Sequence, residues 1–155
     1  MHRLEKIWLI IGTVGLGVFL SILGVSAFTH DNTPSGGETQ IAAKDIGEGK
    51  KFEPGVFPQS DGKIVVQVVA KAFAYEPQKI EVPVGKEIVF KVATTDVIHS
   101  FSIIDTNVNM EIIPGFINQK NYTFKEPGNY LVLCNEYCGI GHQYMKFEIE
   151  VTENE

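Results

Sequence analysis

The sequence has a single arginine, Arg3, in 155 residues, and only two cysteines. The formal net charge is −6, and since the first 28 residues carry +1, the rest of the chain carries −7. A surface with this charge and no arginine does not suit nucleic acid or anionic lipid, so neither is expected as its partner. Apolar residues make up 44%, which excludes general disorder, and the length allows one globular domain with appendages.

Charge is absent from Ile7 to Phe28, a run of 22 residues. At about 1.5 Å per helical residue this run is roughly 33 Å long, enough to cross a hydrocarbon core of about 30 Å. The alternative is a cleaved signal peptide, but the apolar part of such a peptide has only about 7–15 residues. Two basic residues precede the run and an acidic one follows it, which favours a cytoplasmic N-terminus. We expect residues 1–30 to form a single-pass anchor in the membrane lipid, with the rest of the chain outside the cytoplasm.

Residues 31–62 begin with a turn-rich stretch and lack periodicity, so we expect a linker, with a short helix around Ile41–Ile46. Residues 63–155 show short β-branched segments separated by turns, which predicts an all-β, Greek-key β-sandwich. The expected strands are Ile64–Ala70, Lys79–Val84, Glu87–Ala93, Val97–Ile104, Val108–Ile113, Asn121–Phe124, Asn129–Leu133 and Met145–Thr152.

Four side chains that bind soft metals lie within twelve residues, between the last two expected strands. They are Cys134, Cys138, His142 and Met145. A further histidine, His99, shares a strand face with Val97, Phe101 and Ile103, so it is expected to point into the core. Taken singly, each has an ordinary explanation, namely a disulfide, a core or loop histidine, and a methionine that fills space.

Together, thiolate, thioether and imidazole ligands favour copper. Zinc usually takes four ligands in a closed tetrahedron, to which methionine contributes nothing. Blue-copper carriers also combine histidine, cysteine and a weak methionine, but they have one thiolate at the metal. The two cysteines of this loop allow both sulfurs to bridge two metal ions.

The pattern Cys134-x3-Cys138-x3-His142-x2-Met145, with His99 upstream, resembles the copper-binding signature of subunit II of heme–copper cytochrome c oxidases. The segments before His99 and before the cysteines, residues 96–101 and 126–130, agree with that family as well. The resemblance covers the anchor and residues 64–151 and implies a cupredoxin-like β-sandwich. The implied metal ligands are His99, Cys134, the backbone carbonyl of Glu136, Cys138, His142 and Met145.

In that family the two thiolates bridge two copper ions, each histidine binds one ion, and the methionine is a weak ligand. The binuclear centre receives electrons from cytochrome c and passes them to heme in subunit I, where oxygen is reduced to water and protons are pumped. The resemblance therefore implies a subunit of a respiratory oxidase that receives electrons, with heme-bearing subunit I and cytochrome c as partners. The acidic charge outside the anchor predicts docking of a basic cytochrome c and a rate that falls with ionic strength.

Three details qualify the resemblance. A single span is typical of the smaller B-type bacterial oxidases, in which an aromatic pair near Phe73 and Tyr75 lies by the copper site. We expect this pair to line the surface where electrons arrive, and two core aromatics are the alternative.

In many relatives the carboxylate at Glu136 also helps to hold magnesium, a cation that prefers oxygen ligands. Pro114-Gly115 is followed by Phe116 and not by arginine, so no heme propionate contact is expected there.

Two other classes remain open. A thioredoxin-like copper chaperone of oxidase assembly also carries Cys-x3-Cys and a histidine, but it needs an α/β pattern and a helix after its cysteines. A structural adhesion domain would use Cys134 and Cys138 as a disulfide. Strands on both sides of the motif, together with His99 and Met145, favour the oxidase subunit over both.

Overall fold

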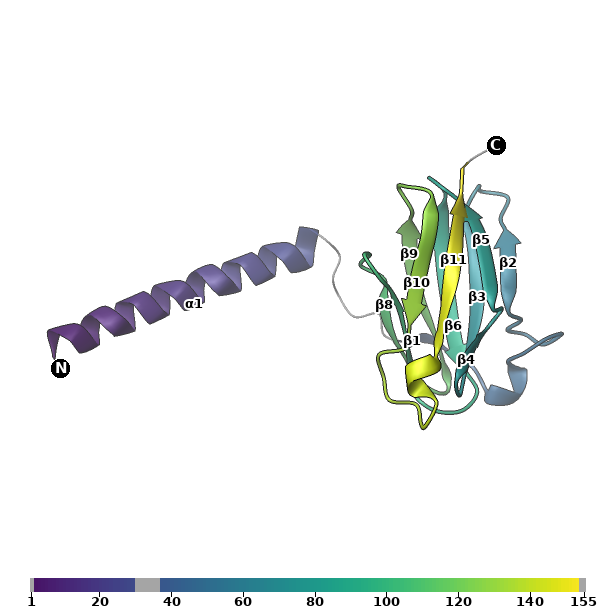
Figure 1. Cartoon of the computed structure of the whole chain (residues 1–155), viewed down its shortest axis with the longest axis horizontal. Helices are drawn as coiled ribbons and strands as arrows, with labels where there is room; N and C mark the ends of the chain where they lie inside the picture. The colour runs from purple at the N-terminus through teal and green to yellow at the C-terminus, as the bar shows by residue number, and fades with distance from the viewer. Residues whose placement is uncertain (1, 30–36, 154–155) are drawn as a thin grey trace. The chain divides into compact units, whose positions relative to one another are not determined.

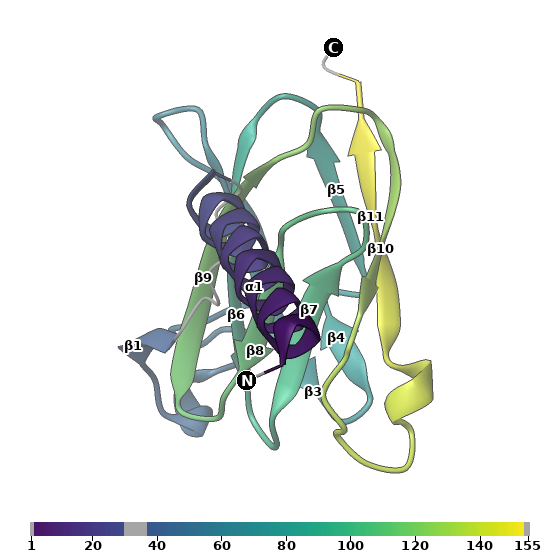
Figure 2. The ribbon, with the colours of Figure 1, turned by 90° about the vertical axis from the view of Figure 1, so that its left-hand side faces the viewer.

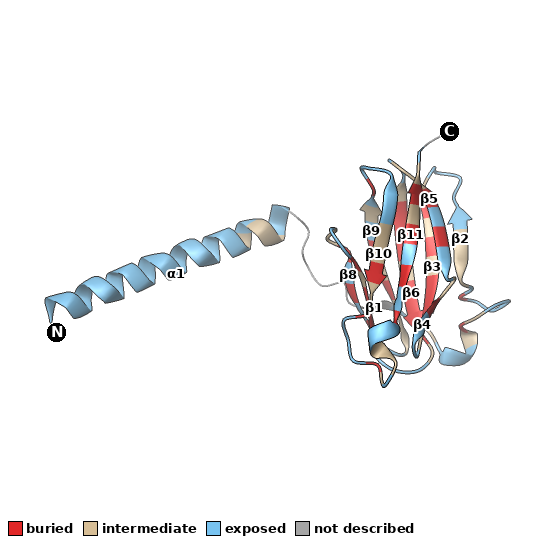
Figure 3. Cartoon of the chain, in the orientation of Figure 1, coloured by how far each residue is buried: buried red, intermediate tan, exposed pale blue. Residues whose placement is uncertain are grey.

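The computed structural model describes residues 2–29 and 37–153. The chain divides into two compact units, Met1–Thr33 and Pro34–Glu155. The first contains helix α1 (Arg3–Thr29), whose most apolar stretch has a mean hydropathy of 2.2 and in which no described residue is buried (Figure 3). Among the described residues it is the one helix long and apolar enough to cross a membrane, in agreement with the predicted anchor.

Two hydroxyl side chains of α1 are compatible with an apolar environment. The Ser21 hydroxyl donates a hydrogen bond of 2.8 Å to the Gly17 carbonyl, and Thr29 donates one of 2.8 Å to Val25. Each hydroxyl is thus satisfied within its own helix, as a segment surrounded by hydrocarbon requires.

The second unit consists of two β-sheets (Figures 1 and 2). The six-stranded sheet has the order β1 (Gly37–Gln40), β9 (Phe116–Thr123), β6 (Glu87–Thr94), β3 (Ile64–Lys71) and β2 (Gly55–Pro58), with β4 (Ala74–Glu76) paired to β3. The five-stranded sheet has the order β5 (Lys79–Pro83), β11 (Lys146–Thr152), β10 (Gly128–Leu133), β7 (His99–Ile103) and β8 (Asn109–Ile112). Non-sequential neighbours in both sheets confirm the predicted all-β sandwich.

The core lies between the two sheets, and its residues alternate along the strands. In β11, Phe147, Ile149 and Val151 are buried, whereas Lys146 and Glu148 are exposed. Aromatic rings fill the centre, where Phe101 lies 5.5 Å from Phe90 and 5.9 Å from Phe147 between ring centroids. Figure 3 shows the buried residues concentrated along the central strands.

The segment predicted as a linker differs from expectation over residues 37–58. It contributes β1, β2 and a 3-10 helix, Ala43–Asp45, inside the region where a short helix was expected. Ile46 and Phe52 are buried against Val69 and Ala93, apart from the main core. Ile46 and Phe52 are separated by charged residues and glycines and follow neither a strand period nor a helix period. The sequence pattern therefore could not predict that they pack against the sheet. Residues 31–36 of the predicted linker lie outside the described residues.

The strand that carries His99 also begins later than predicted. It starts at His99 itself, and Val97 is 44% exposed, so the expectation that Val97 shares the inward face was wrong. The side chain of Asp96 accepts hydrogen bonds from Thr94 and from the Val97 backbone, which forms a local turn before the strand. His99, Phe101 and Ile103 are buried as predicted.

Phe52→Ala tests whether the segment before β2 is part of the folded unit. Phe52 is 2% exposed, so its truncation should lower the free energy of unfolding by about 3 kcal/mol, as for other buried phenylalanines. Phe57→Ala, in the neighbouring exposed position on β2, should cost less than about 1 kcal/mol. Chemical denaturation followed by far-UV circular dichroism measures both, and equal small effects would show that residues 43–52 are a loose linker.

Candidate metal centre

The predicted ligand loop is the connection between β10 and β11, at the lower end of the sandwich in Figure 1. These strands pair as antiparallel neighbours up to Leu133 and Lys146. The Cys134 backbone N–H then donates a hydrogen bond of 3.3 Å to the Met145 carbonyl. Cys134 and Met145 are therefore held beside each other, although the sequence separates them by ten residues.

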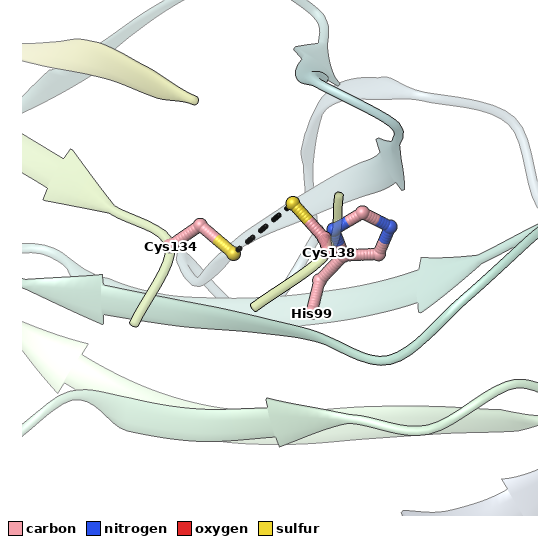
Figure 4. A group of neighbouring side chains, drawn as sticks. All are labelled: His99, Cys134 and Cys138. Carbon is pink, nitrogen blue, oxygen red and sulfur yellow. Dashed lines mark hydrogen bonds between the residues drawn. The ribbon is translucent and has the colours of Figure 1, made fainter. Parts of the chain in front are cut away.

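The second part of the centre comes from β7. This strand is antiparallel to β10, with Ser102 opposite Leu133, which brings His99 beside the start of the ligand loop. The Asn135 backbone N–H donates to the Ser100 hydroxyl and ties the two segments together. Figure 4 shows the His99 ring and both cysteine side chains in one group, and their ligand atoms all lie within 4.8 Å of one another.

The remaining predicted donors lie around the same point. The two thiols are 4.0 Å apart, which makes them hydrogen-bonded free cysteines and not a disulfide. Cys138 Sγ lies 3.6 Å from His142 Nδ1 and 3.6 Å from Met145 Sδ. Cys134 Sγ lies 3.2 Å from the Glu136 carbonyl oxygen. The structure thus brings together all six groups that the sequence singled out.

The His99 ring is oriented by its second nitrogen. Nε2 lies 2.8 Å from Asp96 Oδ1, and Nδ1 is buried without a hydrogen-bond partner among the described residues. A buried ring nitrogen without a partner costs about 1–3 kcal/mol unless something else binds it. Two thiols, a thioether and two imidazoles are the donors that copper prefers, so the residues fit a copper site.

Asp96 is a functional residue that the sequence analysis missed. Partial burial acts to raise the pKa of its carboxyl, but hydrogen bonds from Ala72, His99, Val97 and Thr94 outweigh it and lower the pKa to about 2. A carboxylate bonded to the second nitrogen of a histidine ligand sets the ring's tautomer and orientation. The signal in the sequence was an acidic residue three positions before His99.

The aromatic pair divides between the surface and the interior. Phe73 is 38% exposed, whereas Tyr75 is 2% exposed, so the expectation that both line the surface was wrong for Tyr75. The Tyr75 hydroxyl donates to the Ser100 carbonyl. Burial raises the pKa of Tyr75, and the adjacent Cys134 raises it further. Tyr75 therefore lies beneath the sulfurs as a neutral phenol.

The ligand loop has glycine at positions 139 and 141, and a different physical reason favours glycine at each. Gly139 has a φ of +129°, a backbone conformation that favours glycine. Gly141 has a φ of −93°, which any residue adopts, but a Cβ placed there would lie 2.5 Å from Cγ of Phe73. Backbone freedom thus accounts for Gly139, and a close ring accounts for Gly141.

Comparison with known proteins identifies similar chains. The family model described as cytochrome c oxidase subunit II, periplasmic domain, matches residues 60–152. Cytochrome c oxidase subunit 2 of Thermus thermophilus is 40% identical over 154 residues, which cover 96% of this chain and 92% of that protein. A chain of a heme–copper terminal oxidase dimer superposes with a TM-score of 0.74 at 26% identity, covering 97% of this chain and all of the other. The periplasmic domain of subunit II of cytochrome oxidase from Bradyrhizobium japonicum superposes with a TM-score of 0.54 at 25% identity, over 63% of this chain and 88% of that domain.

The acidity of the thiols offers a direct test of the site's environment. Burial raises the pKa of Cys138, and the neighbouring Cys134 raises it further, to about 11. Because the thiolate is the reactive form, a shift from 9.0 to about 11 reduces its fraction at pH 7 about 100-fold. In copper-free, reduced protein, alkylation of Cys138 by iodoacetamide should therefore keep rising above pH 9, when followed by mass spectrometry.

The urea-unfolded chain provides the control, since its thiols should be half ionised, and so reach half of their full reactivity, near pH 9.0. Folded and unfolded chains that react equally fast at pH 7 would contradict a buried, protonated Cys138. In protein isolated without a reductant, thiols that stay unreactive until one is added would instead show a disulfide.

Proposed function

Since this chain belongs to the cytochrome c oxidase subunit II family, we propose that it receives electrons from cytochrome c at a binuclear copper centre and passes them to heme in subunit I. The observation that carries this proposal is the convergence of three buried side chains, His99 from strand β7 and Cys134 and Cys138 from the loop between β10 and β11. In this proposal oxygen is reduced at the heme-bearing subunit, and this chain supplies the copper centre where electrons enter.

We assign as ligands His99, Cys134, the Glu136 carbonyl, Cys138, His142 and Met145. When bound, two copper ions would supply one-electron chemistry, with the change in charge shared over both ions. The protein holds the donors fixed in three ways. The strands fix His99, the hydrogen bond between Cys134 and Met145 closes the loop, and burial excludes water from both sulfurs. Rigid donors in a dry site keep the rearrangement that accompanies electron transfer small.

The charge of the first residues supports the membrane orientation. Arg3 and Lys6 precede the apolar part of α1, so the N-terminus is cytoplasmic and the copper domain lies on the extracytoplasmic face.

Glu136 is exposed and offers magnesium only its own carboxylate, so a magnesium site would need oxygen ligands from a partner subunit. The chaperone alternative does not fit the all-β unit, in which the described helix after the cysteines has three residues.

The ligand loop carries three large, strongly exposed aromatic and aliphatic side chains, with the amides Asn135 and Gln143 exposed beside them. Tyr137, Ile140 and Tyr144 of the ligand loop are 78%, 89% and 75% exposed, and Glu136 is the one acidic residue between the two ends of the loop. Exposed aromatic and aliphatic side chains that gather at one place mark a protein contact. The acidic charge of the unit as a whole favours a salt-sensitive encounter, whereas this loop favours apolar docking of the cytochrome.

Copper loading of the purified full-length chain tests the proposed centre. We expect two copper ions per chain and an electron paramagnetic resonance spectrum of one electron shared by two equivalent copper nuclei. Cys138→Ser removes one bridging sulfur and should abolish the shared signal, whereas Ser102→Ala, on β7 away from the ligands, should preserve it. One copper per wild-type chain, or zinc bound in preference, would contradict the binuclear centre.

Electron transfer from reduced cytochrome c tests the docking surface. Ile140→Ser should slow the second-order rate about fivefold, since one interface side chain contributes about 1 kcal/mol. Ile104→Ser, at the end of β7 far from His99, should have little effect. The net charge alone predicts a rate that falls with ionic strength, whereas docking through this loop predicts a wild-type rate that changes less than about threefold between about 10 mM and about 150 mM, measured by stopped flow. A steep fall with salt would show instead that the acidic surface governs docking.

A further inference from the structure

The turn between β3 and β4, residues 71–74, contacts both of the segments that carry a histidine. One contact is made by its backbone. The Ala72 N–H donates a hydrogen bond of 2.7 Å to Asp96 Oδ2, and the other oxygen of that carboxylate lies 2.8 Å from His99 Nε2. Ala72, Asp96 and His99 thus form a continuous chain of hydrogen bonds that leads from the turn to the first histidine.

The second contact is made by the Phe73 ring. A Cβ on Gly139 would lie 2.9 Å from Phe73 Cε1, and one on Gly141 would lie 2.5 Å from Cγ. The ring therefore rests directly on the backbone of the ligand loop. Gly141 is the residue before the 3-10 helix His142–Tyr144, so the ring lies against the start of the helix that presents His142.

Burial alone does not explain the position of Phe73. The side chain is 38% exposed and is absent from the main hydrophobic core of buried residues, unlike Tyr75 two positions later. Gly141 has an unstrained backbone, so the Phe73 ring is the feature among the described residues that requires glycine at this position. The closeness of Cγ, at the base of the side chain, means that a rotation of the ring about its own axis cannot relieve a clash.

We propose that the turn at residues 71–74 is a positioning element for both histidine ligands, through the Ala72 amide and Asp96 to His99, and through the Phe73 ring and Gly141 to His142. This inference rests on the copper function proposed above. The turn contributes no ligand itself. It belongs to the six-stranded sheet, whereas His99 and the ligand loop belong to the five-stranded sheet and its connection, so the element couples the two sheets at the metal end.

A double-mutant cycle between Phe73 and Gly141 tests the ring contact in the full-length chain loaded with copper. Gly141→Ala introduces the clash and should weaken copper retention about tenfold and alter the copper hyperfine pattern, as changes around metal ligands do. Phe73→Ala alone should have a smaller effect. The double variant should recover most of what Gly141→Ala loses, because the smaller side chain leaves room for the new methyl group. Phe57→Ala, an exposed phenylalanine on β2, is the control.

Asp96→Asn tests the chain of hydrogen bonds from the Ala72 amide through Asp96 to His99. The neutral amide is a weaker acceptor, so the ring of His99 becomes less electron-rich and the reduction potential of the centre should rise with the copper count unchanged. Asp105→Asn is the matched control, because Asp105 is exposed and asparagine tolerates its φ of +62°. The shift in potential separates positioning from a merely structural loss, which would lower the copper count instead.

Absence of rescue in the double variant, or an unchanged hyperfine pattern in Gly141→Ala, would overturn the ring contact. A reduction potential that is the same in Asp96→Asn and Asp105→Asn would overturn the role of the hydrogen bonds through Asp96. Thermal melting of the copper-free variants shows whether each chain still folds. A wild-type chain that binds no copper would refute the proposed function, and this outcome differs from a copper-loaded wild type whose variants behave alike.

Discussion

The pairing of β7 with β10 is the constraint on which the metal centre depends. It places Ser102 opposite Leu133, and this register brings His99 beside Cys134 while Phe101 and Ile103 enter the core. Side chains alternate between the two faces of a strand, so a slip of one residue would turn His99 to solvent and expose both core residues with it. The burial of Phe101, in contact with Phe90 and Phe147, therefore holds the ligand as well as the core. The same apolar contacts that stabilise the sandwich specify the geometry of the site.

Within that frame, three contacts that do not use the metal-binding atoms hold the donors in place. Asp96 orients His99, the Met145 carbonyl accepts from Cys134, and the Phe73 ring covers the glycines before His142. The ligand loop is closed at its base by the β10–β11 ladder and covered near its tip by a turn from the other sheet. A loop with both ends fixed and one face covered has few alternative conformations available to it. This is the condition under which an electron can arrive and leave without a change in protein structure.

The sequence predicted most of this architecture because strong patterns carry it. The alternation in Met145–Thr152 and the β-branched run at residues 64–70 became β11 and β3, and the spacing of the soft donors identified the site. Apart from Val97, which is exposed because of a local turn, the misses share one cause, since each depends on a contact between residues far apart in the chain. Phe52 packs on Val69 without any local period, and the exposure of Phe73 beside a buried Tyr75 follows from a turn that lies over the ligand loop. Gly141 has an ordinary φ, and the Phe73 ring, which is far away in the sequence, accounts for glycine at this position.

The side chains around the metal site differ in character from the net charge of the whole unit. The net charge outside the anchor is −7, yet the large exposed side chains of the ligand loop are two tyrosines and an isoleucine, and Glu136 is its one carboxylate. Several other acidic residues form ion pairs remote from that loop, such as Glu87 with Lys63 and Glu150 with Lys79. Exposed pairs of this kind largely cancel each other at a distance, and what remains is screened within about 10 Å at ordinary ionic strength. A partner that approaches the centre therefore meets these large exposed side chains at contact distance, and the acidity of the unit acts mainly on the earlier, longer-range part of the encounter.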